Sequence, residues 1–150
     1  MRDLVIAVLA LSLTAVVAVA GVGYLDVGVA GRIEAGSAAT AGFRIYGGAL
    51  TAYRLSNRGL PAEDAWRDEL APYIPGGAPK APSGWKWSYG RDAAGPWFCF
   101  SGADADARSH VLRRTAEAFP AGSVTIAGDC AARPDLGADG VAATYRPIGS

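Results

Sequence analysis

The hydrophobic pattern opens with a long run that carries no charge, from Leu4 to Leu25. Its length meets the roughly 20 apolar residues that a helix needs to cross about 30 Å of hydrocarbon. Tyr24 near its end suits the membrane interface, and Asp26 is the first charge beyond it. The pattern predicts a membrane anchor over residues 1–25 and a separate domain over residues 26–150.

A cleaved secretory signal is the alternative for the same run. Ala18-Val19-Ala20 has the small-x-small form of a cleavage site. Against cleavage, Arg2 is offset by Asp3, and the apolar stretch exceeds the usual signal core of about 7–15 residues. We favour a retained anchor, and both interpretations place the rest of the chain outside the cytoplasm.

Helical periodicity is clear after residue 42. Four apolar residues recur on one helical face, namely Phe43, Tyr46, Leu50 and Tyr53. Asn57 and Gly59 are helix stop signals, so this helix is predicted to end near Asn57. The Gly- and Ala-rich segment 26–42 leaves two alternatives open, a break in the helix or its continuation from the apolar run.

The middle of the chain predicts a short helix and a loop. Pro61 and the acids after it suit a first helical turn, and Pro72 would stop the helix after Leu70. The Gly- and Pro-rich residues from Tyr73 to Gly84 predict a loop.

The second half of the chain predicts a small antiparallel sheet. Four segments are typical of strands: Trp85–Tyr89, Trp97–Phe100, Val124–Ile126 and Val141–Tyr145. Residues from Gly90 to Gly95 predict the first turn. A helix capped by Asp104 or Asp106 is expected to run to about Phe119. The fold class is therefore α+β, with an N-terminal hydrophobic helix, a helical extension, and a sheet carrying one or two packed helices.

Composition excludes several classes of protein. Lys and Arg total 14 and so do Asp and Glu, so the chain lacks the net positive charge on which phosphate neutralisation rests. We therefore expect no nucleic-acid partner. An apolar fraction of 51% and a charged fraction of 19% exclude a disordered chain.

The two cysteines, Cys99 and Cys130, favour a disulfide. They follow an export segment and do not form a C-x-x-C pair. A zinc site is disfavoured because only His110 could join them, and such sites need three or four ligands. Two buried free thiols are the remaining alternative.

Candidate catalytic residues have simpler explanations. His110 is the only histidine, and a triad can be written with Ser109 or Ser101 and Asp129. No G-x-S-x-G sequence accompanies it, so a solvated surface histidine is the better interpretation. The acids favour an exposed helix face over an acid/base pair: Glu63, Asp64, Asp68 and Glu69.

Two further patterns have structural explanations. Asp104 and Asp106 lack the Gly and Glu spacing of a calcium loop, so capping is expected. An aromatic set could stack on a glycan, although core packing is the commoner role: Trp85, Trp87, Tyr89 and Trp97. We expect no cofactor and no metal.

The order of these parts resembles a type IV pilin-like protein. The stretch Phe43-Arg44-Ile45-Tyr46 through Asn57-Arg58-Gly59, followed by Tyr73-Ile74-Pro75-Gly76 and Gly84-Trp85, is similar to the PilM kind of thin-pilus biogenesis protein. The resemblance implies a small inner-membrane protein of a type IVb or conjugative pilus system. It also implies a periplasmic domain with a disulfide-bounded region, matching Cys99 and Cys130.

The chain departs from pilins at its start. Met1-Arg2-Asp3 is not a basic leader ending in Gly, and no acid lies between Leu4 and Leu25, whereas pilins carry a Glu there that serves assembly. We therefore expect an anchored accessory protein without enzymatic activity, whose partners are the lipid bilayer and other membrane proteins of a pilus or secretion machine. The alternatives are a secreted or anchored binding module with a Trp-rich surface and, last, a small hydrolase using His110.

Overall fold

The structure is a computed structural model that describes residues 27–102, 111–128, 130 and 141–147. The chain divides into two units, residues 1–31 and 32–150, and each is described by itself. The predicted anchor, Leu4–Leu25, lies outside the described residues. Within the described ranges, no helix combines the length and the apolar character that crossing a membrane requires.

Helix α2 extends from Val27 to Asn57. The helix is continuous through the described part of the Gly- and Ala-rich segment, and the predicted end at Asn57 is confirmed. Arg58 takes the left-handed conformation, with φ 53°, while its N–H still bonds the carbonyl of Arg54 at 2.9 Å. A residue in this conformation often ends a helix, because its N–H bonds one of the last-turn carbonyls that has no partner within the helix.

The sheet has four antiparallel strands in the order β1-β2-β4-β3, which confirms the α+β class. The strands are β1 (Trp85–Asp92), β2 (Gly95–Gly102), β3 (Val124–Ala127) and β4 (Val141–Tyr145). The predicted turn over Gly90–Gly95 was too long, because only Ala93 and Ala94 form the loop. Gly95, with φ 112°, supplies the backbone conformation that closes so tight a hairpin.

The short helices differ from prediction at their ends. Helix α3 covers Trp66–Leu70, since residues 63–65 form a turn rather than the first helical turn. The predicted end of this helix after Leu70 is confirmed, and Pro72 itself lies in a 3-10 helix, η1 (Ala71–Tyr73). Helix α4 covers Val111–Glu117, so it ends two residues before Phe119, the predicted end. The predicted capping residues, Asp104 and Asp106, lie outside the described residues.

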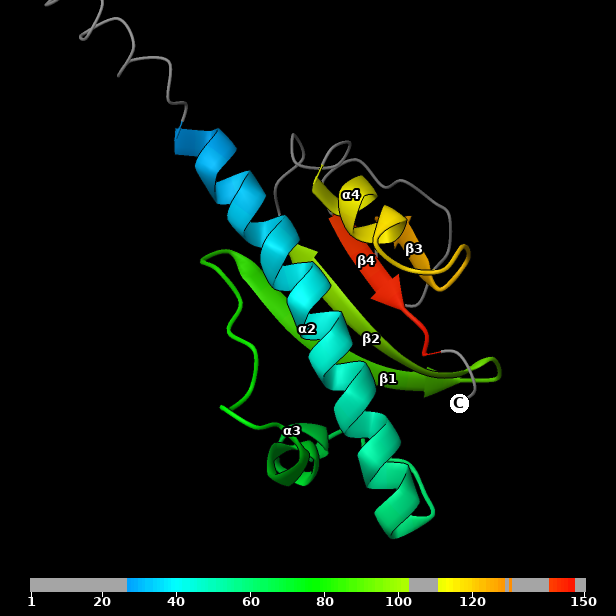
Figure 1. Cartoon of the computed structure of the whole chain (residues 1–150). Helices are drawn as coiled ribbons and strands as arrows, with labels where there is room; N and C mark the ends of the chain where they lie inside the picture. Colours follow the sequence, from blue (N-terminus) through cyan, green and yellow to red (C-terminus); the bar gives the residue numbers. More distant parts are fainter. Residues whose placement is uncertain (1–26, 103–110, 129, 131–140, 148–150) are drawn as a thin grey trace, which may run out of the picture. The chain divides into compact units, whose positions relative to one another are not determined.

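Within the unit 32–150, α2 crosses one face of the sheet (Figure 1). Phe43 and Tyr46 of α2 pack edge-on against the Trp87 ring at centroid distances of 5.3 and 5.2 Å, and Tyr46 stacks on Phe98. Helix α4 joins the same core through Leu112, which is fully buried. Aromatic rings from helix and sheet therefore make one shared hydrophobic core.

The predicted disulfide between Cys99 and Cys130 is confirmed, with the two Cα atoms 5.7 Å apart. The bridge does not join neighbouring strands, because β4 lies between β2 and β3. Side chains alternate along a strand, so Cys99 points away from the core face that Phe98 and Phe100 occupy. Cys130, which follows β3 in the chain, meets Cys99 on this face of the sheet.

Candidate interaction surface

The outward side of α2 exposes apolar side chains. Leu55 is 81% exposed, Ile33 63% and Ile45 40%, and these are the large exposed hydrophobic residues of the described chain. All three lie on one helix, opposite the side that packs on the sheet. They stand 12 and 10 residues apart along the helix, and the exposed charges of Glu34 and Arg44 lie on the same side of it.

Small exposed residues fill the positions between these three. We call the whole set the outer seam: Ile33, Ser37, Ala41, Ile45, Gly48, Thr51 and Leu55. Its members recur every three or four residues, so they lie along one side of α2. Small side chains let the backbone of another helix approach closely. The outer seam is therefore a narrow exposed strip of small and apolar residues along α2.

The side of α2 opposite the outer seam is fixed in place. Gly42 is covered by the Trp87 ring, and Gly47 lies against the ring of Tyr145. Thr40 donates to the carbonyl of Gly36 at 2.9 Å. Because this inner side is buried in the core, α2 cannot turn to hide the outer seam without unfolding.

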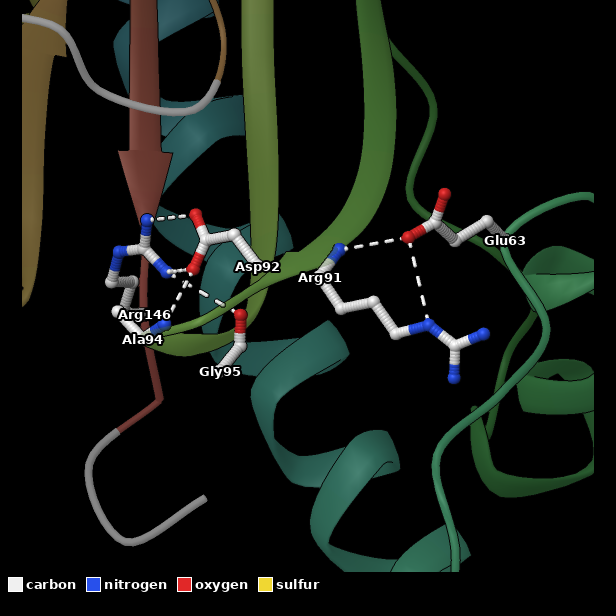
Figure 2. Close-up of polar contacts among 6 residues, drawn as sticks. All are labelled: Glu63, Arg91, Asp92, Ala94, Gly95 and Arg146. Atoms are coloured by element: carbon white, nitrogen blue, oxygen red, sulfur yellow. Dashed lines mark hydrogen bonds and ion pairs between the residues drawn. The ribbon is translucent and has the colours of Figure 1, made fainter.

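A polar clamp ties the end of β4 to the β1–β2 hairpin (Figure 2). The Arg146 guanidinium donates to both carboxylate oxygens of Asp92, at 2.9 and 2.6 Å, and to the carbonyl of Gly95 at 3.4 Å. Asp92 also accepts from the N–H of Ala94. The hydrogen bonds from Arg146, together with that from Ala94, lower the pKa of Asp92 below its ordinary value. Such a bidentate pair fixes geometry as well as charge.

A second polar group lies at the outer edge of β1. The Glu63 carboxylate accepts from the backbone N–H of Arg91 at 3.1 Å and lies 3.7 Å from its guanidinium, as Figure 2 shows. Further along the same strand, Arg67 donates to the carbonyl of Trp87 at 2.8 Å. Glu63 and Arg67 both belong to the segment around α3. Their side chains, and not a further strand, make these hydrogen bonds to the outer edge of β1.

The predicted catalytic candidates are not assembled by the described residues. His110, Ser109 and Asp129 lie outside them, as do Asp104 and Asp106. Ser101 is on β2, and its buried hydroxyl has no hydrogen-bond partner among the described residues. Across that same part of the chain, no group of three His, Cys, Asp or Glu side chains converges as metal ligands would.

The acids around α3 serve structure. Asp64 and Asp68 are exposed, as predicted for a solvated face. Glu69 is half-buried and accepts a short hydrogen bond from the hydroxyl of Tyr53, and this bond raises the pKa of the Tyr53 hydroxyl. Glu69 therefore bonds a structural partner, while Asp64 and Asp68 lie exposed on the helix surface.

The aromatic strand residues are divided between the two faces of the sheet. Trp87 and Tyr89 are buried, and Trp85 stacks on Phe100 at 4.8 Å. Trp97 lies on the other face, over Gly90. Core packing, the role that sequence favoured, is confirmed for Trp87 and Tyr89, and the four rings form no continuous stacking platform.

Comparisons with protein-family models, curated proteins and solved structures find no match to this chain.

Proposed function

We propose that this chain is an inner-membrane-anchored, pilin-like accessory component of type IV pilus biogenesis or of a related secretion machine. The observation that carries the proposal is the outer seam of α2. A long helix that packs one side on an antiparallel sheet and exposes small and apolar residues on the other suits lateral contact with a second helix. The sequence resemblance to pilin-like proteins points the same way.

The proposal gives each part of the chain a structural role. The uncharged run Leu4–Leu25 holds the protein in the bilayer. The outer seam contacts helices of partner membrane proteins, and the Cys99–Cys130 bridge holds the sheet domain together in the periplasm. The absence of an acid in the apolar run favours an accessory role over that of a major fibre subunit. The role needs neither catalysis nor a cofactor.

The Trp-rich binding module is the weaker candidate. It requires aromatic faces open to a ligand, but the rings of Trp87 and Tyr89 are buried, Trp87 against Tyr46 of α2 and Tyr89 against Trp66 of α3. No described contact favours it over the helix-packing role.

Charged substitutions in the outer seam test the proposal. Ala41→Arg and Gly48→Arg add charge at exposed positions, and nothing lies within 4 Å of a Cβ at Gly48, so the fold should hold. We expect both variants to lose the pilus or secretion proteins that co-purify with the wild-type chain from membranes. The matched control is Ser83→Arg, at an exposed position outside the outer seam.

Two results would contradict this proposal. One is unchanged co-purification of the same proteins with both outer-seam variants. The other is a wild-type chain that brings no pilus or secretion protein from its native membranes.

A further inference from the structure

Cys99 lies between two hydroxyl side chains on the face of the sheet that carries the disulfide. The register places Ser88 of β1 on one side of it and Thr144 of β4 on the other. The backbone N–H of Arg146 bonds the carbonyl of Ser123, so alternation turns the backbone groups of Thr144 toward β3 as well. Cys99 and Thr144 are therefore a non-hydrogen-bonded pair, the kind whose side chains lie closest, with Cα atoms about 4.5 Å apart.

The hydroxyl of Thr144 is buried and unbonded. Thr144 is 1% exposed, and its Oγ1 atom finds no hydrogen-bond partner among the described residues. Such a group destabilises a folded chain, and a redox role is one of the reasons for which proteins retain one. A bridged sulfur accepts hydrogen bonds weakly, whereas a thiolate carries a full charge and accepts them strongly. The hydroxyl therefore gains a strong acceptor beside it only when the bridge at Cys99 opens.

The two bridged residues differ in access to solvent. Cys99 is fully buried, whereas Cys130 is partly exposed. Thiol–disulfide exchange begins with the attack of a thiolate on a sulfur that it can reach, and it is faster when the departing thiolate is stabilised. Attack therefore falls on Cys130, and Cys99 departs. Thr144 lies beside the sulfur that must take up the charge.

We propose that the Cys99–Cys130 bridge is an exchange site for a dithiol, opened from the Cys130 side, with the Thr144 hydroxyl donating a hydrogen bond to the released Cys99 sulfur. The thiolate of the dithiol forms a bond to Cys130 Sγ, and the electron pair of the broken bridge goes to Cys99 Sγ. The second sulfur of the dithiol then displaces Cys130. The dithiol ends as a disulfide, and its two protons end on the two cysteines. This inference rests on the geometry of the sheet and is independent of the proposed function.

The experiment opens the bridge in the folded full chain with excess dithiothreitol and counts the released thiols by alkylation over time. Thr144→Val removes the hydroxyl and keeps the shape of the side chain, so we expect the opening rate to fall by about tenfold. Thr144→Ser keeps a hydroxyl and should open at nearly the wild-type rate. The matched control is Thr125→Val, an exposed position opposite Thr144 and one strand further from Cys99, which should leave the rate unchanged.

A second measurement separates this role from packing. In the bridged protein, Thr144→Val removes an unbonded buried hydroxyl, so the urea midpoint of unfolding should rise. In the reduced protein, the same substitution removes the hydrogen-bond partner of Cys99, so the midpoint should fall. A role in packing alone would move both midpoints in the same direction.

Four results would each overturn the inference. Thr144→Val could open as fast as the wild type, Thr125→Val could slow opening equally, or both urea midpoints could move in the same direction. The fourth is an opening rate that rises with urea, below the unfolding transition, as steeply as global unfolding does. The bridge would then open only in the unfolded chain, where the Thr144 hydroxyl is no longer held beside Cys99.

Discussion

At the scale of single residues, three glycines are each covered by an indole ring. A Cβ at Gly42 would lie 2.1 Å from the Trp87 ring, one at Gly90 2.3 Å from Trp97, and one at Gly102 2.7 Å from Trp85. Each ring occupies the space that a side chain would fill, so an extra methyl group there forces the ring or the backbone to move. These positions require glycine for its small size and not for its backbone freedom, because none of the three has a positive φ.

Two glycines on opposite sides of α2 give a matched pair of substitutions. Gly42→Ala should lower the free energy of unfolding by about 1–3 kcal/mol through overpacking against Trp87. Gly48→Ala should raise it by up to about 1 kcal/mol, because the position is open and Ala favours a helix. Urea unfolding followed by tryptophan fluorescence measures both. Equal effects of the two substitutions would contradict the packing described for α2.

Tyr89 should titrate late. Burial raises the pKa of its hydroxyl to about 12, whereas the unfolded chain titrates near 10. The neutral phenol therefore contributes its full stability below pH 10, and that contribution is lost as the pH rises from about 10 to about 12. Absorbance at 295 nm should show a late phase that Tyr89→Phe removes.

The same variant tests how the hydroxyl is buried. The Tyr89 oxygen finds no hydrogen-bond partner among the described residues, so Tyr89→Phe should leave stability at neutral pH nearly unchanged. A large loss of stability at neutral pH would show that the hydroxyl has a partner.

At the scale of elements, the predicted bounds of helices and strands were right where they depended on a local sequence pattern. The bounds of β4, Val141–Tyr145, and the end of α2 at Asn57 match the predictions because alternation and stop signals lie within a few residues. The β1–β2 turn was placed wrongly because glycines normally indicate loops. Gly90 instead stays in the strand beneath the Trp97 ring, a contact that no local rule contains.

The candidate surfaces were harder to predict than the fold. Residues of the outer seam, such as Ala41 and Gly48, were seen only as a Gly- and Ala-rich stretch, because exposure depends on which side of α2 the sheet covers. The hydrogen bonds of Glu63 and Arg67 to the backbone of β1 were missed because each joins residues that are 20 or more positions apart in the chain. The recurrence of small and apolar residues every three or four positions from Ile33 to Leu55 was the available signal for the outer seam.

Loss of the disulfide should weaken the sheet domain. Cys99→Ala/Cys130→Ala opens a loop with a sequence separation of 31, so we expect the free energy of unfolding to fall by about 2–5 kcal/mol. The double substitution avoids a lone thiol that could mis-pair. Urea unfolding measures the loss, and reduced wild-type protein is the matched control because it should lose a similar amount. Two free thiols in the unreduced, unfolded wild type would refute the bridge.

At the scale of the whole molecule, the two faces of the sheet are stabilised differently. One face is packed by α2 and α4 through aromatic rings, whereas the other carries Cys99 and the bridge to Cys130. The polar clamp between Asp92 and Arg146 ties the turn end of the β1–β2 hairpin to the residue that follows β4. The packed unit 32–150 therefore leaves the outer seam of α2 exposed, whereas side chains bond the outer edge of β1.

Membrane attachment is the last prediction, and it depends on the run before α2. Leu9→Arg with Leu13→Arg adds two charges near the middle of that run, and each costs about 2.5–3.5 kcal/mol on insertion. We expect the variant to move from the membrane pellet to the supernatant in carbonate extraction of cells. The matched control is Leu55→Arg, an exposed position on α2, which should stay in the pellet. Release of the wild-type protein itself would show that the run is no anchor, and a mature N-terminus at Gly21 would identify it as a cleaved signal.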